Sequence, residues 1–242
     1  MLALLSVARH GVAAPPSSEC AAGQFAVAID AGHGPEDGGA QSARGVPEYA
    51  FNQRLANLVL GALLANGFQR AALLDPDGRG LGLRERVVET RRLAPRLLIS
   101  VHHDSVQPGY LQEWSWEGQR RRYSDRFRGF SLFVSRNNGD FPASLAFAKL
   151  LGRRLVDAGF SPSLHHAEDI EGERRPLLDA DVGVFAGDRL AVLAHDAAPA
   201  VLIEAGIIVN RNEERMLDQP AFRQRFAAAV VAAVEAFCAQ HR

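Results

Sequence analysis

The stretch Phe25-Ala26-Val27-Ala28-Ile29-Asp30-Ala31-Gly32-His33-Gly34 leads from an apolar run to a histidine between two glycines. The apolar run is continuous rather than alternating, which is typical of a strand buried on both faces of a sheet. A polar, glycine-rich loop follows, and Pro47-Glu48 then opens a helical pattern. The stretch therefore predicts a buried strand with an imidazole at its end and a carboxylate in the first turn of the next helix.

Strand and helix patterns alternate along the rest of the chain. The expected strands are residues 25–29, 68–74, 97–101, 130–135 and 200–203, and the expected helices are residues 47–65, 83–93, 142–157 and a last segment opened by Pro220. Such alternation predicts an α/β fold with a mostly parallel, mixed sheet covered by helices on both faces. The length of 242 residues suits one domain with one sizeable core.

The charge and hydropathy of the chain argue against nucleic-acid binding and against a membrane span. The formal net charge is -1, so the usual electrostatic argument for nucleic-acid binding is missing. No run of about 18 apolar residues occurs, so we expect no membrane span.

Residues 1–22 have features of a secretory signal: a short apolar run, small residues and a Pro/Ser-rich stretch at 15–18. A basic segment at the start is missing, and a disordered tail is the alternative interpretation. We expect a signal or N-terminal tail over residues 1–22, a folded domain over residues 23–242, and export to the periplasm or cell envelope.

Two cysteines lie near the ends of the chain, Cys20 and Cys238. In a reducing compartment they would be two thiols without consequence. In an oxidising compartment they could join the N-terminal segment to the last helix. Both interpretations remain open at this point.

Four polar groups are expected to converge at one edge of the sheet, because ligands of such sheets collect beyond the carboxyl ends of the strands. His33, His102 and Glu204 each follow an expected strand, and Glu48 heads a helix. Two imidazoles and one carboxylate are a familiar catalytic zinc set that leaves a fourth position for water. Glu204 could then serve as the general base, although a structural ion pair is the alternative for a carboxylate at the end of a buried strand.

The motifs around these groups resemble those of the zinc-dependent N-acetylmuramoyl-L-alanine amidases of the third amidase family, the cell-wall amidases of AmiC type. The family patterns D-P-G-H-G, L-x-x-R-V, S-I-H and E-x-G-F-I-S-N are matched in order by Asp30-Ala31-Gly32-His33-Gly34, Leu83-Arg84-Glu85-Arg86-Val87, Ser100-Val101-His102 and Glu204-Ala205-Gly206-Ile207-Ile208-Val209-Asn210. Ala31 replaces the usual proline. His103 follows the matched histidine directly; we prefer His102 because side chains alternate along a strand and because it fits the S-I-H motif.

The resemblance implies that His33, Glu48 and His102 hold Zn²⁺ and that Glu204 is the catalytic carboxylate. The implied reaction is hydrolysis of the amide between N-acetylmuramic acid and the L-alanine of the peptidoglycan stem peptide, with peptidoglycan as substrate and an activator protein as a further partner. Two alternatives are a zinc peptidase of carboxypeptidase type that acts on stem peptides and a non-catalytic cell-wall binding module.

Substrate contacts are expected from an aromatic segment, residues 106–128, which leaves the strand that carries His102. It contains Trp114 and Trp116, which could stack on sugar rings, or could instead pack against each other in a lid. Arg84 and Arg86 could reach the cleft, and Arg84 is a further candidate for substrate contact, although arginines on helix surfaces are common. We expect the pair His165-His166 to be solvated on an exposed strand.

Overall fold

The computed structural model describes residues 20–195 and 197–240. Residues 1–19 of the expected signal segment therefore lie outside the described residues. Among the described helices, none has the length and apolar character needed to cross a membrane.

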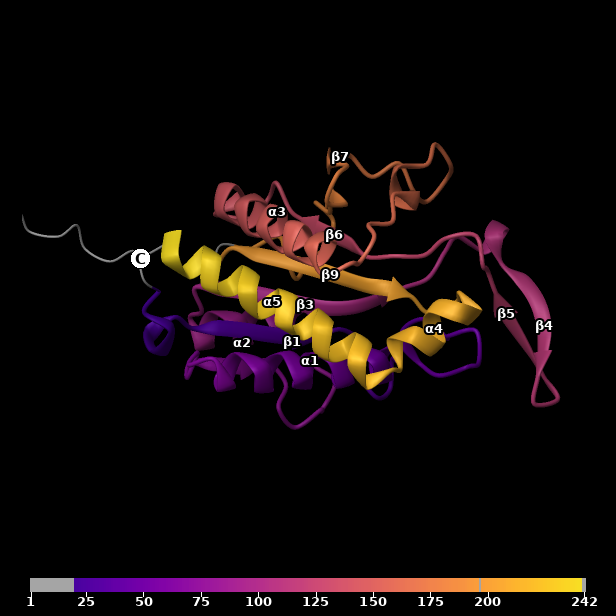
Figure 1. The fold of residues 1–242 in the computed structure, drawn as a ribbon, viewed down its shortest axis with the longest axis horizontal. Coiled ribbons are helices and arrows are strands. Elements are labelled where there is room, and N and C mark those ends of the chain that lie inside the picture. Colours follow the sequence, from indigo (N-terminus) through magenta and orange to yellow (C-terminus); the bar gives the residue numbers. More distant parts are fainter. Residues whose placement is uncertain (1–19, 196, 241–242) are drawn as a thin grey trace, which may run out of the picture.

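Nine strands and five α-helices make up the described fold (Figure 1). The strands are β1 (Val27–Ala31), β2 (Ala71–Leu73), β3 (Leu97–Asp104), β4 (Gln112–Trp116), β5 (Gln119–Tyr123), β6 (Ser131–Val134), β7 (Leu177–Asp179), β8 (Val184–Ala186) and β9 (Ala200–Ile207). The helices are α1 (Glu48–Ala65), α2 (Leu83–Leu93), α3 (Phe141–Asp157), α4 (Arg211–Leu217) and α5 (Pro220–Gln240).

Seven of the strands form one mixed sheet in the order β2-β1-β3-β9-β6-β8-β7. The strands β2, β1, β3 and β9 are parallel, so their carboxyl ends lie at the same edge. Beyond them β6 runs antiparallel to β9, and β7 runs antiparallel to β8. The expected α/β fold with a mostly parallel, mixed sheet is confirmed.

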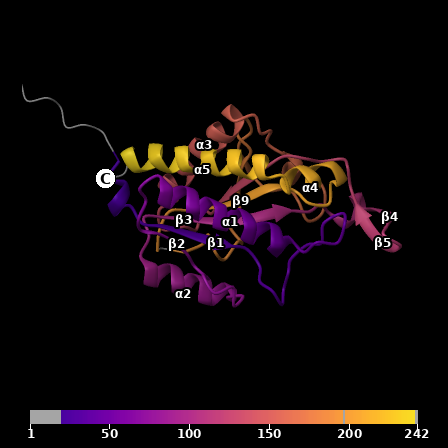
Figure 2. The same cartoon turned by 60° about the horizontal axis from the view of Figure 1, so that its bottom comes forward.

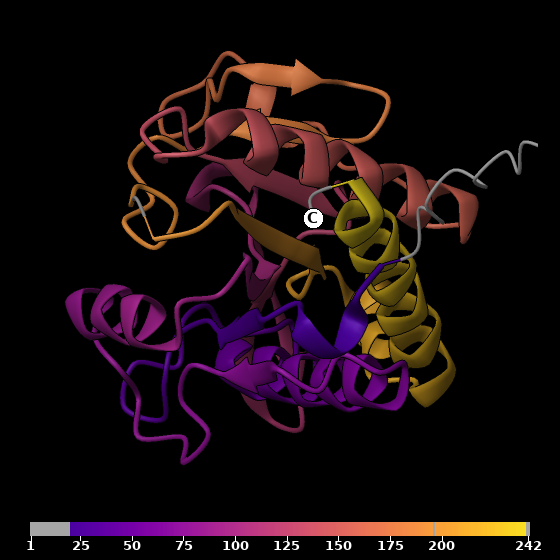
Figure 3. The same ribbon diagram turned by 90° about the vertical axis from the view of Figure 1, so that its left-hand side faces the viewer.

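Helices cover both faces of the sheet, but unequally. α1, α3 and α5 lie on one face, where α5 packs against both of the others, and α2 lies on the opposite face (Figures 2 and 3). Odd-numbered residues of β3 and β9, such as Val101 and Ile203, belong to the larger core under α1 and α5. Even-numbered residues, such as Leu98 and Leu202, pack in a smaller core on the face of α2. This alternation fixes which side chains of the two strands face α2.

The two cysteines form a disulfide. Cys20 and Cys238 are bonded, with their Cα atoms 5.2 Å apart and 218 residues between them in sequence. The bond ties Cys20, which lies near the end of the expected N-terminal segment 1–22, to the last turns of α5, so this part of the segment is joined to the folded domain. This is the geometry required by the second of the two interpretations of the cysteine pair.

One substructure was not expected from the sequence. β4 and β5 form a separate antiparallel hairpin within residues 106–128. In Figure 1 it projects from the end of the molecule toward which β3 and β9 point. The short strands β7 and β8 and the short helix α4 were also not expected.

Candidate metal centre and active site

The loop after β1 places His33 at the carboxyl edge of the sheet. His33 has a positive φ of 64°, a conformation uncommon for residues other than glycine. Gly32 lies directly against the ring of His102: a Cβ added to it would be 2.1 Å from Cε1 of that ring. Gly39, with φ +71°, leaves similarly little room beside Glu48 and His33. The two glycines thus allow the two histidine rings and the carboxylate to approach one another.

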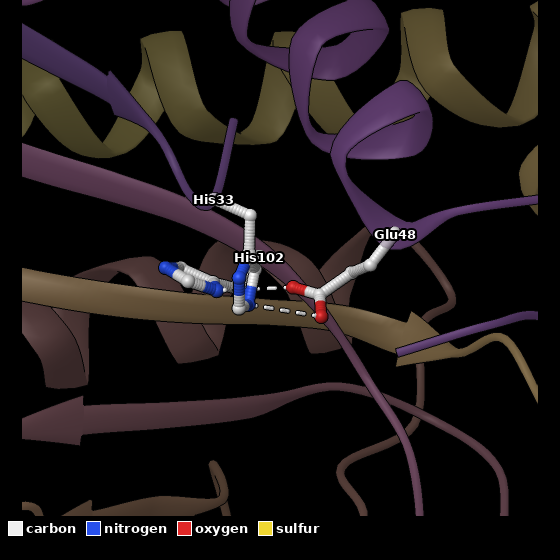
Figure 4. A group of neighbouring side chains, drawn as sticks. All are labelled: His33, Glu48 and His102. Carbon is white, nitrogen blue, oxygen red and sulfur yellow. Dashed lines mark hydrogen bonds and ion pairs between the residues drawn. The ribbon is translucent and has the colours of Figure 1, made fainter. Parts of the chain in front are cut away.

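Glu48, the first residue of α1, contacts both imidazoles with its carboxylate (Figure 4). Its Oε2 atom is 3.1 Å from Nε2 of His33, and its Oε1 atom is 3.0 Å from Nδ1 of His102. The backbone N–H of Ala40 donates to Oε2, and the side-chain amide of Asn52 donates to Oε1. Burial alone would raise the pKa of Glu48, but its contacts with the two imidazoles outweigh burial and hold the pKa well below its usual range. Glu48 is therefore an ionised carboxylate inside the fold.

Strand alternation separates His102 from His103. His102 faces the site, whereas His103 points to the other face of the sheet, where its ring packs on Phe51 and its Nδ1 is 2.8 Å from Oδ1 of Asn52. Burial lowers the pKa of His103 to about 3, so this ring is neutral. The structure thus brings His102, and not His103, beside His33 and Glu48.

The chemistry and spacing of these three residues fit a divalent metal ion. Each offers one ligand atom, and the three atoms lie within 4.8 Å of one another. Zinc is bound by imidazole nitrogen and carboxylate oxygen at about 2.0–2.2 Å, so neighbouring ligand atoms in a tetrahedral site lie roughly 3.3 Å apart. The two contact distances of 3.0 and 3.1 Å come close to this value.

A cleft of about 400 Å³ opens beside the imidazoles. Its lining includes His33, His102 and residues 79–83, and Asp37 and Arg86 add charge to its wall. His33 remains partly exposed, with 29% of its side-chain surface accessible. We call His33, Glu48 and His102 the metal set. A ligand in the cleft can therefore reach this set at the partly exposed His33.

Glu204 lies on β9, in register with His102 on the neighbouring strand β3. Because paired residues of adjacent strands project to the same face, both side chains face α2. The Oε2 atom of Glu204 is inaccessible and makes no hydrogen bond within the described part of the chain. Burial, together with the negative charges of Asp104 and Glu48, raises the pKa of Glu204 well above its usual value. A carboxyl group without an ion-pair partner beside a metal set suits proton transfer rather than a structural ion pair.

Arg86, which the sequence named beside Arg84 as able to reach the cleft, supports the loop that carries His33. The guanidinium of Arg86 is buried, forms an ion pair with Asp30, and donates to the backbone carbonyls of Ala31 and His33. Asp30 also accepts a hydrogen bond of 2.7 Å from Ser100 on β3. Arg84, the sequence candidate on the same helix, is exposed, and Arg86 rather than Arg84 lines the cleft.

The aromatic segment lies at the same end of the molecule as the metal set. Trp114 and Trp116 stack with ring centroids 5.4 Å apart, and Arg44 lies 4.8 Å above the Trp116 ring. The indole N–H of Trp114 donates to the carbonyl of Ala43, in the loop between His33 and Glu48. Both rings are half-buried. The hairpin is thus joined to the loop that supplies two of the metal-set residues.

The pair His165-His166 differs from the sequence expectation. These residues lie in a 3₁₀ turn, His165–Ala167, and not on an exposed strand. His165 is only 3% exposed, and both rings contact Asp104. The expectation was wrong because the partner of the pair, Asp104, lies about 60 residues earlier in the chain, where no local pattern can show it.

Comparison with known proteins identifies relatives of this chain. The family model Amidase_3, described as N-acetylmuramoyl-L-alanine amidase, matches residues 27–236. AmiB of Haemophilus influenzae, a probable N-acetylmuramoyl-L-alanine amidase, is 26% identical over 89% of this chain and 52% of its own length. AmiA of Escherichia coli is 25% identical over 90% of this chain and 78% of its own length. This chain therefore spans about half the length of AmiB and most of AmiA.

Solved structures show the same fold. The catalytic domain of the amidase CwlV from Bacillus (Paenibacillus) polymyxa var. colistinus is 26% identical, with a TM-score of 0.66 over 87% of this chain and 96% of that domain. The amidase Ami1 from Mycobacterium smegmatis is 22% identical, with a TM-score of 0.70 over 90% of this chain and 98% of its own. With a family model that covers most of its length, this chain belongs to the Amidase_3 family of N-acetylmuramoyl-L-alanine amidases.

Proposed function

We propose that this chain hydrolyses the amide between N-acetylmuramic acid and the L-alanine of the peptidoglycan stem peptide. The observation that carries this proposal is the convergence of His33, Glu48 and His102 at the sheet edge, with Glu204 on the neighbouring strand. Family membership supplies the substrate class. The same residues would have no purpose in a module that only binds the cell wall.

We propose Zn²⁺ as the ion held by His33, Glu48 and His102, because two imidazoles and one carboxylate are a ligand set typical of catalytic zinc. Such an ion, when bound, supplies a Lewis acid that polarises the amide carbonyl and lowers the pKa of water. Glu48 enters this set ionised, and its hydrogen bond from Asn52 fixes the orientation of its carboxylate. Arg86 and Asp30 hold the backbone at His33, so the imidazole is oriented before any ligand arrives.

Glu204 is proposed as the general base and acid. Its carboxyl group faces the same side of the sheet as His102, and its Oε2 atom has no hydrogen-bond partner among the described residues. In this role it takes a proton from the attacking water and passes it to the leaving amine of L-alanine. Burial raises the pKa of Glu204, which favours its protonated form, the form that returns the proton to the leaving amine.

The β4–β5 hairpin is proposed to contact the polymer. It stands at the end of the sheet where the metal set lies, and it carries two half-buried indole rings beside several arginines. Indoles stack on sugar rings, and guanidinium groups pair with the carboxylates of stem peptides. Arg84, exposed at the start of α2 near the cleft, remains a weaker proposal for the same role.

We propose that the protein is exported and acts in the periplasm or cell envelope. The disulfide between Cys20 and Cys238 supports this, since disulfides persist in oxidising compartments.

An activator protein is proposed as a further partner: a solved structure of the same fold, the amidase CwlD from Clostridioides difficile, is in complex with the lipoprotein GerS. Adding envelope extract to the purified protein should then accelerate digestion of sacculi.

Identification of the products tests the reaction. Purified protein incubated with sacculi should release stem peptides that begin with L-alanine and leave glycan strands with free lactyl groups. Release of single residues from the carboxyl end of the stem would show a carboxypeptidase instead. Binding to sacculi without any soluble product would show a wall-binding module. Either of these results overturns the proposal.

A further inference from the structure

A second cluster of two imidazoles and one carboxylate lies outside the first metal set. Asp104 at the end of β3 faces His165 and His166 of the 3₁₀ turn. Its Oδ2 atom is 3.2 Å from Nε2 of His165 and 2.8 Å from Nε2 of His166. These three ligand atoms also lie within 4.8 Å of one another. The cluster repeats the ligand types and the spacing of the set at His33, Glu48 and His102, without sharing any residue with it.

His165 carries a buried nitrogen, Nε2, that makes no well-formed hydrogen bond within the described part of the chain. The side chain of His165 is only 1% accessible. Its Nε2 atom faces Oδ2 of Asp104 without the alignment of a hydrogen bond, and it has no other partner in the described part of the chain. A buried polar atom whose only neighbour is poorly placed for a hydrogen bond is costly. A metal ion between this nitrogen and Asp104 would satisfy it.

The far nitrogens of both rings are fixed by the protein. Nδ1 of His166 is 2.9 Å from Oε2 of Glu173, and Glu173 in turn accepts a hydrogen bond from the amide of Gln107. Nδ1 of His165 is 2.9 Å from the hydroxyl oxygen of Ser163. Metal-binding histidines characteristically use their second nitrogen in this way, and the partner fixes which nitrogen faces the ion. Both Nε2 atoms are therefore presented to the same point.

Aromatic side chains enclose the cluster. Phe127 stacks on His165 with ring centroids 5.1 Å apart, and Phe133 meets His166 edge-on at 4.9 Å. Such walls limit water around the ligand atoms and strengthen the interaction of a cation with Asp104. Asp104 is also the residue in the cluster that provides negative charge directly to the proposed ion.

We infer that Asp104, His165 and His166 form a second binding site for a divalent transition-metal ion such as Zn²⁺. Two imidazoles and one carboxylate are ligands that favour such ions over Mg²⁺ or Ca²⁺. The site would join the end of β3 to a turn about 60 residues later, next to the strand that carries Glu204. Its role would therefore be to stabilise the wall of the active site.

The competing explanation is a purely hydrogen-bonded network. Burial lowers the pKa of His166, but the carboxylates of Asp104 and Glu173 outweigh it and raise the pKa to about 9. In that explanation a proton on Nε2 occupies the place that we assign to the ion. It predicts no second ion at any zinc concentration near neutral pH, so metal stoichiometry separates the two.

The test compares metal content in four proteins after removal of metal with a chelator and dialysis against a small excess of Zn²⁺ at pH 7.5. We expect two zinc ions per chain in the wild type, one in His102→Ala, one in His166→Gln, and two in the control Glu168→Gln. Glu168 belongs to the same loop but bonds Tyr110 and Arg126 instead of the cluster. One ion in the wild type with none in His102→Ala, or an unchanged content in His166→Gln, would overturn the inference.

A second measurement keeps the inference testable if His166→Gln does not fold. In the His102→Ala protein, where the first set is broken, Zn²⁺ should still raise the melting temperature, and Co²⁺ should give the absorption spectrum of a nitrogen- and oxygen-ligated site. A melting temperature in His102→Ala that does not respond to either ion would overturn the second site. It would leave the proposed amidase activity untouched, because that activity depends on the other three ligands.

Discussion

His102 and Glu204 occupy paired positions on the adjacent parallel strands β3 and β9, so that an imidazole of the metal set and a carboxyl group without a partner project to the same face. The pairing fixes their separation through backbone hydrogen bonds rather than through loop conformation. Groups held on rigid strands keep the orientation that proton transfer requires. In the proposed mechanism three of the four residues, His33, Glu48 and His102, would hold the ion, and Glu204 would stand beside it.

The first prediction concerns the register at His102. His102→Ala should lower the zinc content by one ion per chain and abolish turnover, because it removes one of three ligands. His103→Ala should keep the ion of the first set, since His103 points to the other face, toward Phe51 and Asn52. Metal analysis and activity on sacculi would check both variants. Loss of the ion in His103→Ala alone would show that the ligand has been misassigned.

Much of this site followed from the sequence because parallel strands end at one edge. The runs before His33, His102 and Glu204 predicted three buried strands, and their observed positions β1, β3 and β9 are neighbours in the sheet. The bounds of α2, Leu83–Leu93, also match the expected helix. Local periodicity was sufficient for these elements because each buries an apolar stripe or run.

The remaining features depend on contacts between distant segments. Arg86 is buried because it pairs with Asp30, 56 residues earlier in the chain. No local sequence pattern distinguishes Arg86 from the exposed Arg84 on the same helix. The partner of His166, Asp104, is 62 residues away. The β4–β5 hairpin is mostly polar and exposed, so it lacks the apolar alternation by which strands are predicted.

The disulfide should contribute strongly to stability. Replacing both Cys20 and Cys238 by alanine removes a crosslink across 218 residues, which the chain-entropy model values at about 5 kcal/mol. Urea unfolding of the oxidised proteins should show this loss. A reducing agent should bring the wild type to the stability of the double variant and leave that variant unchanged. Two free thiols in oxidised wild-type protein would remove the basis of this prediction.

Glu213 should make stability depend on pH. Burial outweighs its hydrogen bonds from the backbone of Gly129 and Ile207 and raises its pKa to about 7, above the usual 4.5. A raised pKa in the folded state means that its contribution is full below about pH 4.5 and is lost as pH rises through 7. Relative to Glu213→Gln, the wild type should therefore lose roughly 2–3 kcal/mol of unfolding free energy between pH 5 and pH 8.

Urea unfolding of both proteins at several pH values would measure this difference directly. Comparing the two proteins at each pH cancels the contributions of groups that they share. A stability difference that stays constant from pH 5 to pH 8 would show that Glu213 has an ordinary pKa in the folded protein.

The aromatic hairpin should act on polymer more than on small substrates. The double variant Trp114→Ala with Trp116→Ala should bind sacculi more weakly, by about 1 kcal/mol or slightly more per ring, and hydrolyse a short soluble muropeptide nearly as fast as the wild type. Because the two rings stack on each other and Arg44 lies over the Trp116 ring, the melting temperature of the double variant is the control for a loss of stability. Equal losses on both substrates together with a lowered melting temperature would instead show that the rings only pack the hairpin.

The most direct test of the account is to measure zinc content and turnover on the same preparation of Glu204→Gln. Amide replaces carboxylate at nearly constant size, so the fold and the set at His33, Glu48 and His102 should be preserved. The account predicts the zinc content of the wild type and undiminished binding to sacculi, with turnover lower by roughly two to four orders of magnitude, as is usual for loss of a general acid–base group. Release of the ion of the first set, or turnover close to that of the wild type, would contradict it.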